Sequence, residues 1–245
     1  MRYKVDVMYD GSGFLGWQIQ PDTRTVQFEI EKVLSSMHKN EVTIMASGRT
    51  DTGVHALNQV FHFDSTLNLN EQDWIKALNG QLPNDIHILN VTKTHDTFHA
   101  RFDAVSKTYV YKLNVGAYDV FNRNYVYQYN RPVDIDAFRS ILNIFMGCHD
   151  FTSFNKTPLE TLENQVRKIE EIELKVVNQQ ISVIIKGDGF LRHMIRVLVG
   201  SAIATLEGKI TKEVLKDALM NPNKQSIPYI VPGCGLYLKQ VDYIE

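Results

Sequence analysis

The chain has no long hydrophobic run and almost no cysteine. No stretch approaches ~18 consecutive apolar residues, so we expect no helix that spans a membrane. Cys148 and Cys234 are the only cysteines, which is too few for a disulfide framework, and a reducing cytoplasm is the expected location. The first residues alternate and carry Asp6 early, which predicts a strand rather than a signal peptide.

A strong charge imbalance is also missing, because 26 basic residues stand against 28 acidic ones, a net charge of −2. Composition therefore does not mark a nucleic-acid-binding protein. If RNA is the partner, the basic residues must gather on one face. The 245 residues, 44% hydrophobic and 22% charged, suit one large domain or two small ones with a buried core.

Hydrophobic periodicity in the first half predicts the order strand, helix, strand, strand, helix, strand. Alternation predicts strands over residues 3–10, 42–46, 57–64 and 86–94. Helical spacing predicts two helices, which Thr25 and Asn70 cap. This order is the split β-α-β pattern, so the chain is expected to be an α+β protein.

The second half repeats that order with additions. A long strand is predicted over 105–116, a short one over 125–129 and a helix after Asp134. Next come a hairpin over 166–177 and 180–186 and an apolar helix over 190–206. The last elements are a shorter helix from Thr211 and a strand over 236–243. The join near 102–106 is short, which divides the chain into residues 1–103 and 104–245.

A glycine-rich segment after the first strand matches the dinucleotide-binding pattern G-x-G-x-x-G, over Gly11, Gly13 and Gly16. That pattern needs a helix that opens on the turn and receives the pyrophosphate. Pro21 blocks the continuation of such a helix from upstream. The next predicted helix begins only near Thr25. We therefore interpret the segment as a loop that glycine permits, and expect no nucleotide cofactor.

A second loop, residues 46–56, places Arg49 and Asp51 between Gly48 and Gly53. A charged loop between two strands suits a functional site on a rigid sheet. The alternative is a turn whose Asp bonds its own backbone. Spacing alone does not decide between them.

Two arginines lie in the predicted apolar helix over 190–206. Arg192 and Arg196 are four residues apart and so are expected on one face. Either both are solvated, or one is buried and needs an acidic partner, for which Asp51 is a candidate.

A metal site is not expected, because His95 and His99 lack the intervening Glu of the H-E-x-x-H pattern. A serine or cysteine nucleophile is not expected either, since no G-x-S-x-G elbow is present.

Taken together, the motifs closely resemble those of the bacterial tRNA pseudouridine synthase A family. The resemblance runs from near Tyr3 to near Tyr243 and is carried by several segments in order: YDGSGFLGWQ (9–18), GRTDTGVH (48–55), FHARF (98–102), KTYVY (107–111), HDFTSF (149–154), residues 189–200 and GLYL (235–238). One departure is Thr52, where the family usually has Ala, and it could alter the hydrogen bonds of the loop.

The resemblance implies a fold of two ferredoxin-like halves that share one long antiparallel sheet. It implies that Asp51 is the nucleophile, that Tyr109 stacks on the target base, that Arg196 pairs with Asp51 and that Arg49 holds the flipped nucleotide. It also implies a homodimer without cofactor or metal, which acts on uridines 38, 39 and 40 in the anticodon stem-loop of tRNA.

The residue types suit this reaction, since a carboxylate can add to the sugar or the base, or assist proton removal at C2′. The sequence does not choose among these routes. The main alternative is a non-catalytic ferredoxin-like RNA-binding protein, which would use Tyr109 and Tyr111 but leave Asp51 and Arg196 without a role.

Overall fold

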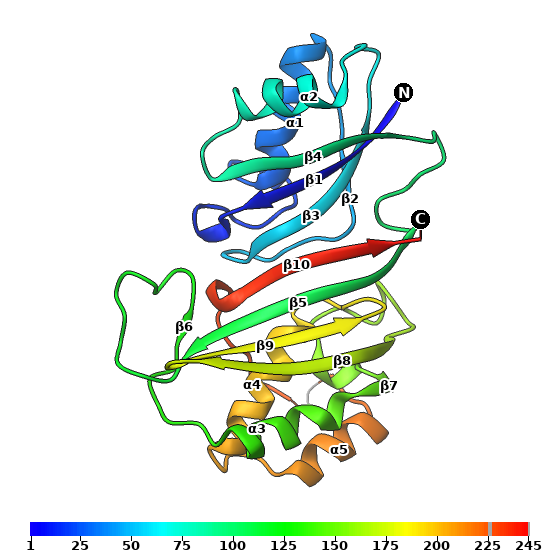
Figure 1. Cartoon of the computed structure of the whole chain (residues 1–245). Coiled ribbons are helices and arrows are strands. Elements are labelled where there is room, and N and C mark those ends of the chain that lie inside the picture. Colours follow the sequence, from blue (N-terminus) through cyan, green and yellow to red (C-terminus); the bar gives the residue numbers. More distant parts are fainter. Residues whose placement is uncertain (225–226, 245) are drawn as a thin grey trace. The chain divides into compact units, whose positions relative to one another are not determined.

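The computed structural model describes residues 1–224 and 227–244, which form two compact units (Figure 1). The first unit contains residues 1–105 together with the last strand, and the second contains Ser106–Leu236. The sequence assigned everything after residue 103 to the second half. The last strand instead belongs to the first unit, because it pairs with a strand there.

The sheet of the first unit is built around β1 (Arg2–Tyr9), which lies antiparallel between β3 (His55–Asp64) and β4 (Ile86–Thr94). On the other side of β3 lies β10 (Leu236–Tyr243), which runs parallel to it. The predicted strand over 42–46 is reduced to β2 (Met45–Ala46), a short partner of β3.

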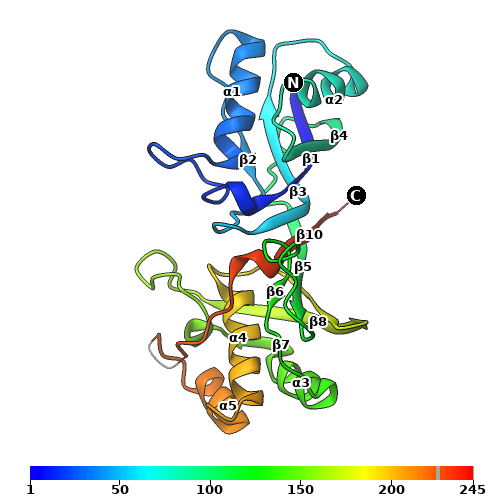
Figure 2. The same cartoon turned by 90° about the vertical axis from the view of Figure 1, so that its left-hand side faces the viewer.

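Two helices cover one face of this sheet (Figure 2). As predicted, Thr25 caps α1 (Val26–His38) and Asn70 caps α2 (Glu71–Asn79), each through its side-chain oxygen. The ring of Trp74 in α2 lies 5.4 Å from that of Tyr3 in β1. The ring of His38 in α1 stacks on the Trp74 ring, with centroids 5.9 Å apart. Both helices therefore bury the face that carries Tyr3, Val5 and Val7, as the alternation of β1 predicts.

The sheet of the second unit has the order β5 (Ala104–Asn114), β9 (Gln180–Gly187), β8 (Val166–Val177) and β7 (Gly147–Asp150), all antiparallel. The predicted hairpin of β8 and β9 is confirmed. A short β6 (Tyr127–Gln128) runs parallel to β5. β7 was not predicted, because its four residues are too few for a visible period.

Three helices complete the second unit: α3 (Ile135–Leu142), α4 (Met194–Leu206) and α5 (Lys212–Met220). Asp134 caps α3 as predicted, and Thr211 precedes α5. The predicted start of the apolar helix at Phe190 was wrong. His193 has φ +63°, a left-handed conformation that interrupts the helical backbone immediately before Met194.

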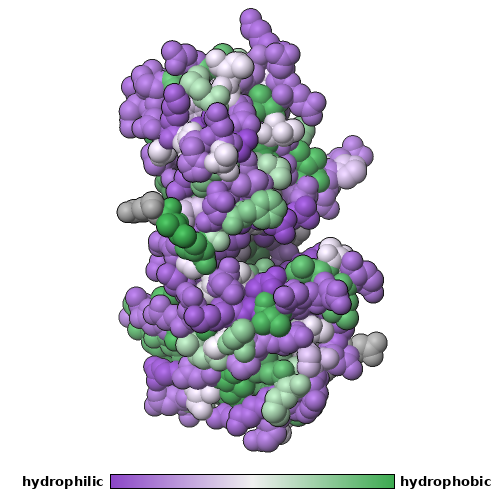
Figure 3. Space-filling model, turned by 90° about the vertical axis from the view of Figure 1, so that its right-hand side faces the viewer, coloured by the Kyte–Doolittle hydropathy of each residue, from purple (hydrophilic) through white to green (hydrophobic). Residues whose placement is uncertain are grey.

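The α+β class is confirmed in both units, whose sheets are mostly antiparallel. Figure 3 shows hydrophobic side chains in small groups separated by hydrophilic ones on the face that it draws. In residues 1–224 and 227–244, no helix is both long and apolar enough to cross a membrane.

Candidate active-site elements

The loop that carries Asp51 connects β2 to β3, and its first residues are bonded to β3. The backbone N–H of Ser47 donates to the carbonyl of Val60 at 2.8 Å. The Ser47 hydroxyl donates to Oε1 of the buried Gln59 at 2.6 Å, and Nε2 of Gln59 donates to the Gly48 carbonyl at 3.0 Å. A polar side chain buried in the strand therefore fixes where the loop begins.

The centre of the loop is fixed through Thr50. Its hydroxyl lies 2.8 Å from the hydroxyl of Tyr9, and its carbonyl accepts from the backbone N–H of Trp17 at 3.0 Å. Burial raises the pKa of Tyr9 well above its usual range, so its hydroxyl keeps its proton. Asp51 itself is half-buried, while Arg49 and Thr52 are exposed.

The glycine-rich segment over residues 11–16 is the surface against which this loop packs. Gly16 has φ +91°, and a Cβ built on it would lie 2.7 Å from the Thr50 carbonyl oxygen. A Cβ on Gly11 would lie 2.0 Å from the carbonyl oxygen of Val54. The glycines therefore let two backbones approach each other next to Asp51.

Sequence reasoning interpreted this segment as a loop that glycine permits, and it missed this packing role. The spacing of the glycines was the available signal. Closely spaced glycines that bind no phosphate indicate that another backbone segment packs against them. The segment forms a single 3-10 turn over Gly11–Gly13, and the first α-helix begins only at Val26.

Sequence reasoning assigned no role to His55. Its Nδ1 accepts from the Gly11 backbone N–H at 3.0 Å, and its ring stacks on Tyr237 of β10 at 4.6 Å. The same Nδ1 lies 3.2 Å from Asp10 Oδ1. His55 therefore connects the glycine-rich segment, the end of the Asp51 loop and the last strand.

In the second unit, Tyr109 lies on β5 opposite Ile185 of β9. The residue is 9% exposed, and its ring meets that of Phe190 edge-on, with centroids 5.3 Å apart at 84°. This edge-on contact fixes the plane of the tyrosine ring.

Arg196 lies in the first turn of α4 and is half-buried. Its Nε donates to the carbonyl of Val231 at 2.8 Å, and the backbone N–H of Val231 donates to the Arg196 carbonyl at 3.2 Å. The expectation that Arg192 shares its helix face was wrong, because Arg192 precedes the helix and is exposed.

The predicted site residues therefore fall into two groups. Arg49 and Asp51 share one loop of the first unit, while Tyr109 and Arg196 belong to the second. The pairing of Asp51 with Arg196 would join the two units, and it stays a prediction.

Comparison with known proteins identifies the family. A family model described as tRNA pseudouridine synthase matches residues 7–103 and 141–244. The tRNA pseudouridine synthase A 1 of Bacillus cereus is 46% identical, over 99% of this chain and 98% of its own length. The chain belongs to the tRNA pseudouridine synthase A family. The prediction of an isomerase of this family is thereby confirmed.

More distant relatives cover the chain equally well. The tRNA pseudouridine synthase A of a Geobacillus strain is 42% identical, over 99% of this chain and 98% of its own. The tRNA pseudouridine synthase A of Malacoplasma penetrans is 41% identical, over 99% of this chain and 100% of its own length. Among solved structures, a chain of a Cbf5–Nop10–Gar1 complex has a TM-score of 0.40 and 12% identity, over 97% of this chain and 58% of its own, which is too low for any inference.

His62 of the synthase is used structurally. His62 Nδ1 accepts from the backbone N–H of Ala100 at 3.1 Å, and its ring lies 4.9 Å from that of His99. Burial lowers the pKa of His62 to about 4, so it is neutral near pH 7. Within residues 1–224 and 227–244, no group of three or more His, Cys, Asp or Glu residues could hold a metal ion.

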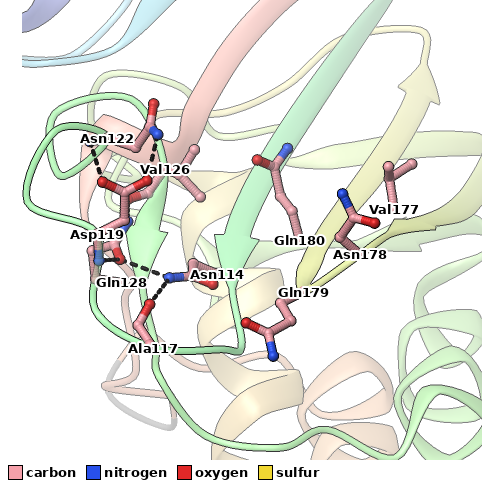
Figure 4. Close-up of a pocket in the computed structure, with 10 residues that line it drawn as sticks. All are labelled: Asn114, Ala117, Asp119, Asn122, Val126, Gln128, Val177, Asn178, Gln179 and Gln180. Carbon is pink, nitrogen blue, oxygen red and sulfur yellow. Dashed lines mark hydrogen bonds between the residues drawn. The ribbon is translucent and has the colours of Figure 1, made fainter.

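A cavity of about 330 Å³ lies between the loop after β5 and the turn between β8 and β9 (Figure 4), and neither Tyr109 nor Arg196 lines it. Several of its polar side chains are bonded to one another. Asn114 Nδ2 donates to Gln128 Oε1 at 2.8 Å, and Asn122 Nδ2 donates to Asp119 Oδ2 at 2.6 Å. This network orders the loop that leads to β6, and we assign the cavity no ligand.

Proposed function

We propose that this synthase converts uridine to pseudouridine at positions 38, 39 and 40, in the anticodon stem-loop of tRNA, with Asp51 as its nucleophile. The observation that carries the proposal is the support of the Asp51 loop. Tyr9, Trp17 and Gln59 bond the loop residues on the N-terminal side of Asp51, which leaves its half-buried carboxylate on a fixed backbone.

The reaction breaks the N1–C1′ bond of uridine, turns the uracil and joins its C5 to C1′. The hydrogen on C5 leaves as a proton, and no group is gained or lost. A carboxylate at Asp51 can add to the sugar or to the base, or assist proton removal at C2′. Each route requires an ionised carboxylate, and none requires an imported reagent.

The other site residues would hold the substrate. Extrusion of a base from its stack costs a few kcal/mol. A tyrosine face at Tyr109 would return roughly 1–3 kcal/mol by stacking. Arg49 is exposed beside Asp51, where its guanidinium would bind the phosphate of the flipped nucleotide.

Arg196 would pair with Asp51 in the assembled site. At ~4 Å and an effective dielectric constant near 20, the attraction is roughly 4 kcal/mol. Desolvation offsets much of this, so the pair would serve to orient the carboxylate and keep it ionised rather than to stabilise the fold. A structure in which the two side chains lie more than about 8 Å apart would contradict the pairing.

We also propose that the enzyme is a cytoplasmic homodimer that binds tRNA across both subunits. A net charge of −2 supports this, because one protomer offers limited basic surface for a polyanion and two-fold symmetry doubles it.

Asp51→Asn is the experiment that tests the central assignment. The amide is nearly isosteric, so folding and tRNA binding should persist, while the nucleophile is lost. Release of tritium from tRNA labelled at uracil C5 measures the reaction directly, and wild type should release it without added metal or cofactor.

The variant should release no tritium above background while it still shifts tRNA in a gel. Asp136→Asn is the matched control, because this carboxylate is 92% exposed on α3, and it should behave as wild type. Tritium release near the wild-type rate from Asp51→Asn would remove Asp51 as nucleophile. No release from wild type would contradict the proposed reaction at these positions.

A further inference from the structure

The segment Tyr229–Pro232 lies directly against the helix that carries Arg196. Val231 forms two hydrogen bonds with Arg196, one to its backbone carbonyl and one from its Nε. One turn further along α4, a Cβ on Gly200 would lie 3.0 Å from backbone atoms of Tyr229 and Ile230. The segment and the helix therefore touch along two consecutive turns, without side chains between them at Gly200.

The far end of the same segment is fastened to β5 by Tyr111. The hydroxyl of Tyr111 donates to the carbonyl of Pro232 at 2.9 Å, and the tyrosine is fully buried. A Cβ on Gly235 would lie 2.9 Å from Cζ of the Tyr111 ring. Burial raises the pKa of Tyr111 well above its usual range, so the hydroxyl keeps the proton that it donates.

These contacts set the direction of the Arg196 guanidinium. The group is planar, so one bond from Nε to the Val231 carbonyl fixes the plane in which its remaining N–H groups lie. The position of that carbonyl depends on the residue beside it, Pro232, whose own carbonyl is bonded to Tyr111. A displacement of Pro232 would therefore rotate the guanidinium.

We propose that Tyr111 is a positioning residue of the synthase, which acts through Pro232 and Val231 to hold the Arg196 guanidinium in its working orientation. This rests on the proposed function, in which Arg196 pairs with Asp51. Tyr111 does not touch the substrate in this role. It differs from Tyr109, its neighbour on the same face of β5, which is the residue proposed to stack on the base.

Tyr111→Phe tests the proposal, because it keeps the buried ring and removes only the hydroxyl. Tyr127→Phe is the matched control, since its ring lies 6.4 Å from that of Tyr111 in the same cluster. We expect Tyr111→Phe to lower kcat roughly tenfold with KM for tRNA changed less than about twofold, as loss of one orienting hydrogen bond would. Tyr127→Phe should remain near wild type.

Two further readouts separate positioning from packing. Amide hydrogen exchange in the peptide that covers residues 229–236 should become faster in Tyr111→Phe and not in Tyr127→Phe. In an Arg196→Lys background, which lacks the Nε bond, adding Tyr111→Phe should change kcat less than about twofold.

An unchanged kcat in Tyr111→Phe would overturn the positioning role and leave the proposed function standing. The same would follow if Tyr111→Phe lowered kcat by an equal factor in wild type and in Arg196→Lys. Full activity in Arg196→Lys alone would instead remove Arg196 from the proposed function, and the positioning role with it. The exchange measurement would still show whether Tyr111 holds the segment.

Discussion

Tyr109 and Tyr111 show how differently two residues on one strand face are used. Both are buried and two positions apart on β5, so the sequence pattern treats them alike. The structure separates them, because Tyr109 meets Phe190 edge-on while Tyr111 donates to a backbone carbonyl. Periodicity predicts the shared face of a strand, but the partners of each side chain depend on elements far away in the chain.

At Tyr109, two substitutions distinguish stacking from proton transfer. Tyr109→Phe keeps the aromatic face, so it should retain most tRNA affinity and slow turnover if the hydroxyl relays a proton during C5 deprotonation. Tyr109→Leu removes the π-face and should weaken both, with affinity reduced by roughly 1–3 kcal/mol. Filter-binding and tritium-release assays measure the two effects. Equal activity in all three proteins would show that Tyr109 only packs the core.

His62 predicts a dependence of stability on pH. Its pKa of about 4 in the folded protein lies below the ordinary value of 6.5, so the unfolded chain binds the proton more tightly. Stability therefore falls as the pH is lowered from about 6.5 towards 4, by roughly 2–3 kcal/mol from this group. Above pH 7 both states are neutral and the contribution vanishes.

Urea denaturation between pH 4.5 and 7.5 measures this contribution. His62→Asn retains an acceptor for the Ala100 N–H and does not titrate, so its free energy of unfolding should fall less than that of wild type over this range. Parallel curves for the two proteins would show that His62 does not supply the slope.

At the scale of elements, the Asp51 loop and the glycine-rich segment behave as one packed pair. Gly16→Ala would place a methyl group 2.7 Å from the Thr50 carbonyl on a backbone with φ +91°. The strain of a left-handed alanine is about 1–2 kcal/mol before any contact is counted. The two loops must therefore separate beside Asp51, and kcat/KM should fall at least about tenfold.

Gly13→Ala is the control for this prediction, because its added Cβ would meet the flexible end of the Arg24 side chain at 3.2 Å rather than backbone. Tritium release by the two variants, at matched circular dichroism, gives the comparison. Equal rates would mean that the close approach of the two loops does not matter for catalysis.

Much of the element order could be predicted from the sequence, and the failures have local causes. Three helix starts were predictable from their capping residues, because a cap is a hydrogen bond between residues close in sequence. These residues are Thr25, Asn70 and Asp134. The start of α4 could not be predicted, since the left-handed turn at His193 leaves no trace in hydrophobic periodicity. The hydrogen bonds between Arg196 and Val231 could not be predicted either, because Val231 is more than thirty positions away in the sequence.

At the scale of the whole molecule, the predicted homodimer has a measurable consequence. A chain with net charge −2 must place its basic residues on the face that meets tRNA, and log Kd should rise linearly with log salt through counterion release. Sedimentation at micromolar concentration should show a dimer, and affinity should fall steeply between about 50 and 200 mM salt. A monomer that binds tRNA at full affinity would count against the proposal.

The parallel pairing of β10 with β3 determines when the first unit can finish folding. His55, at the end of the Asp51 loop, stacks on Tyr237, and these two residues are register partners. During translation, the whole second unit is made before Tyr237 emerges. A nascent chain therefore carries the Asp51 loop without its last neighbour, and closure of this long-range contact is a late, slow step. The proposed nucleophile, Asp51, therefore lies in a loop whose contact with β10 can form only after residues 106–236 have been made.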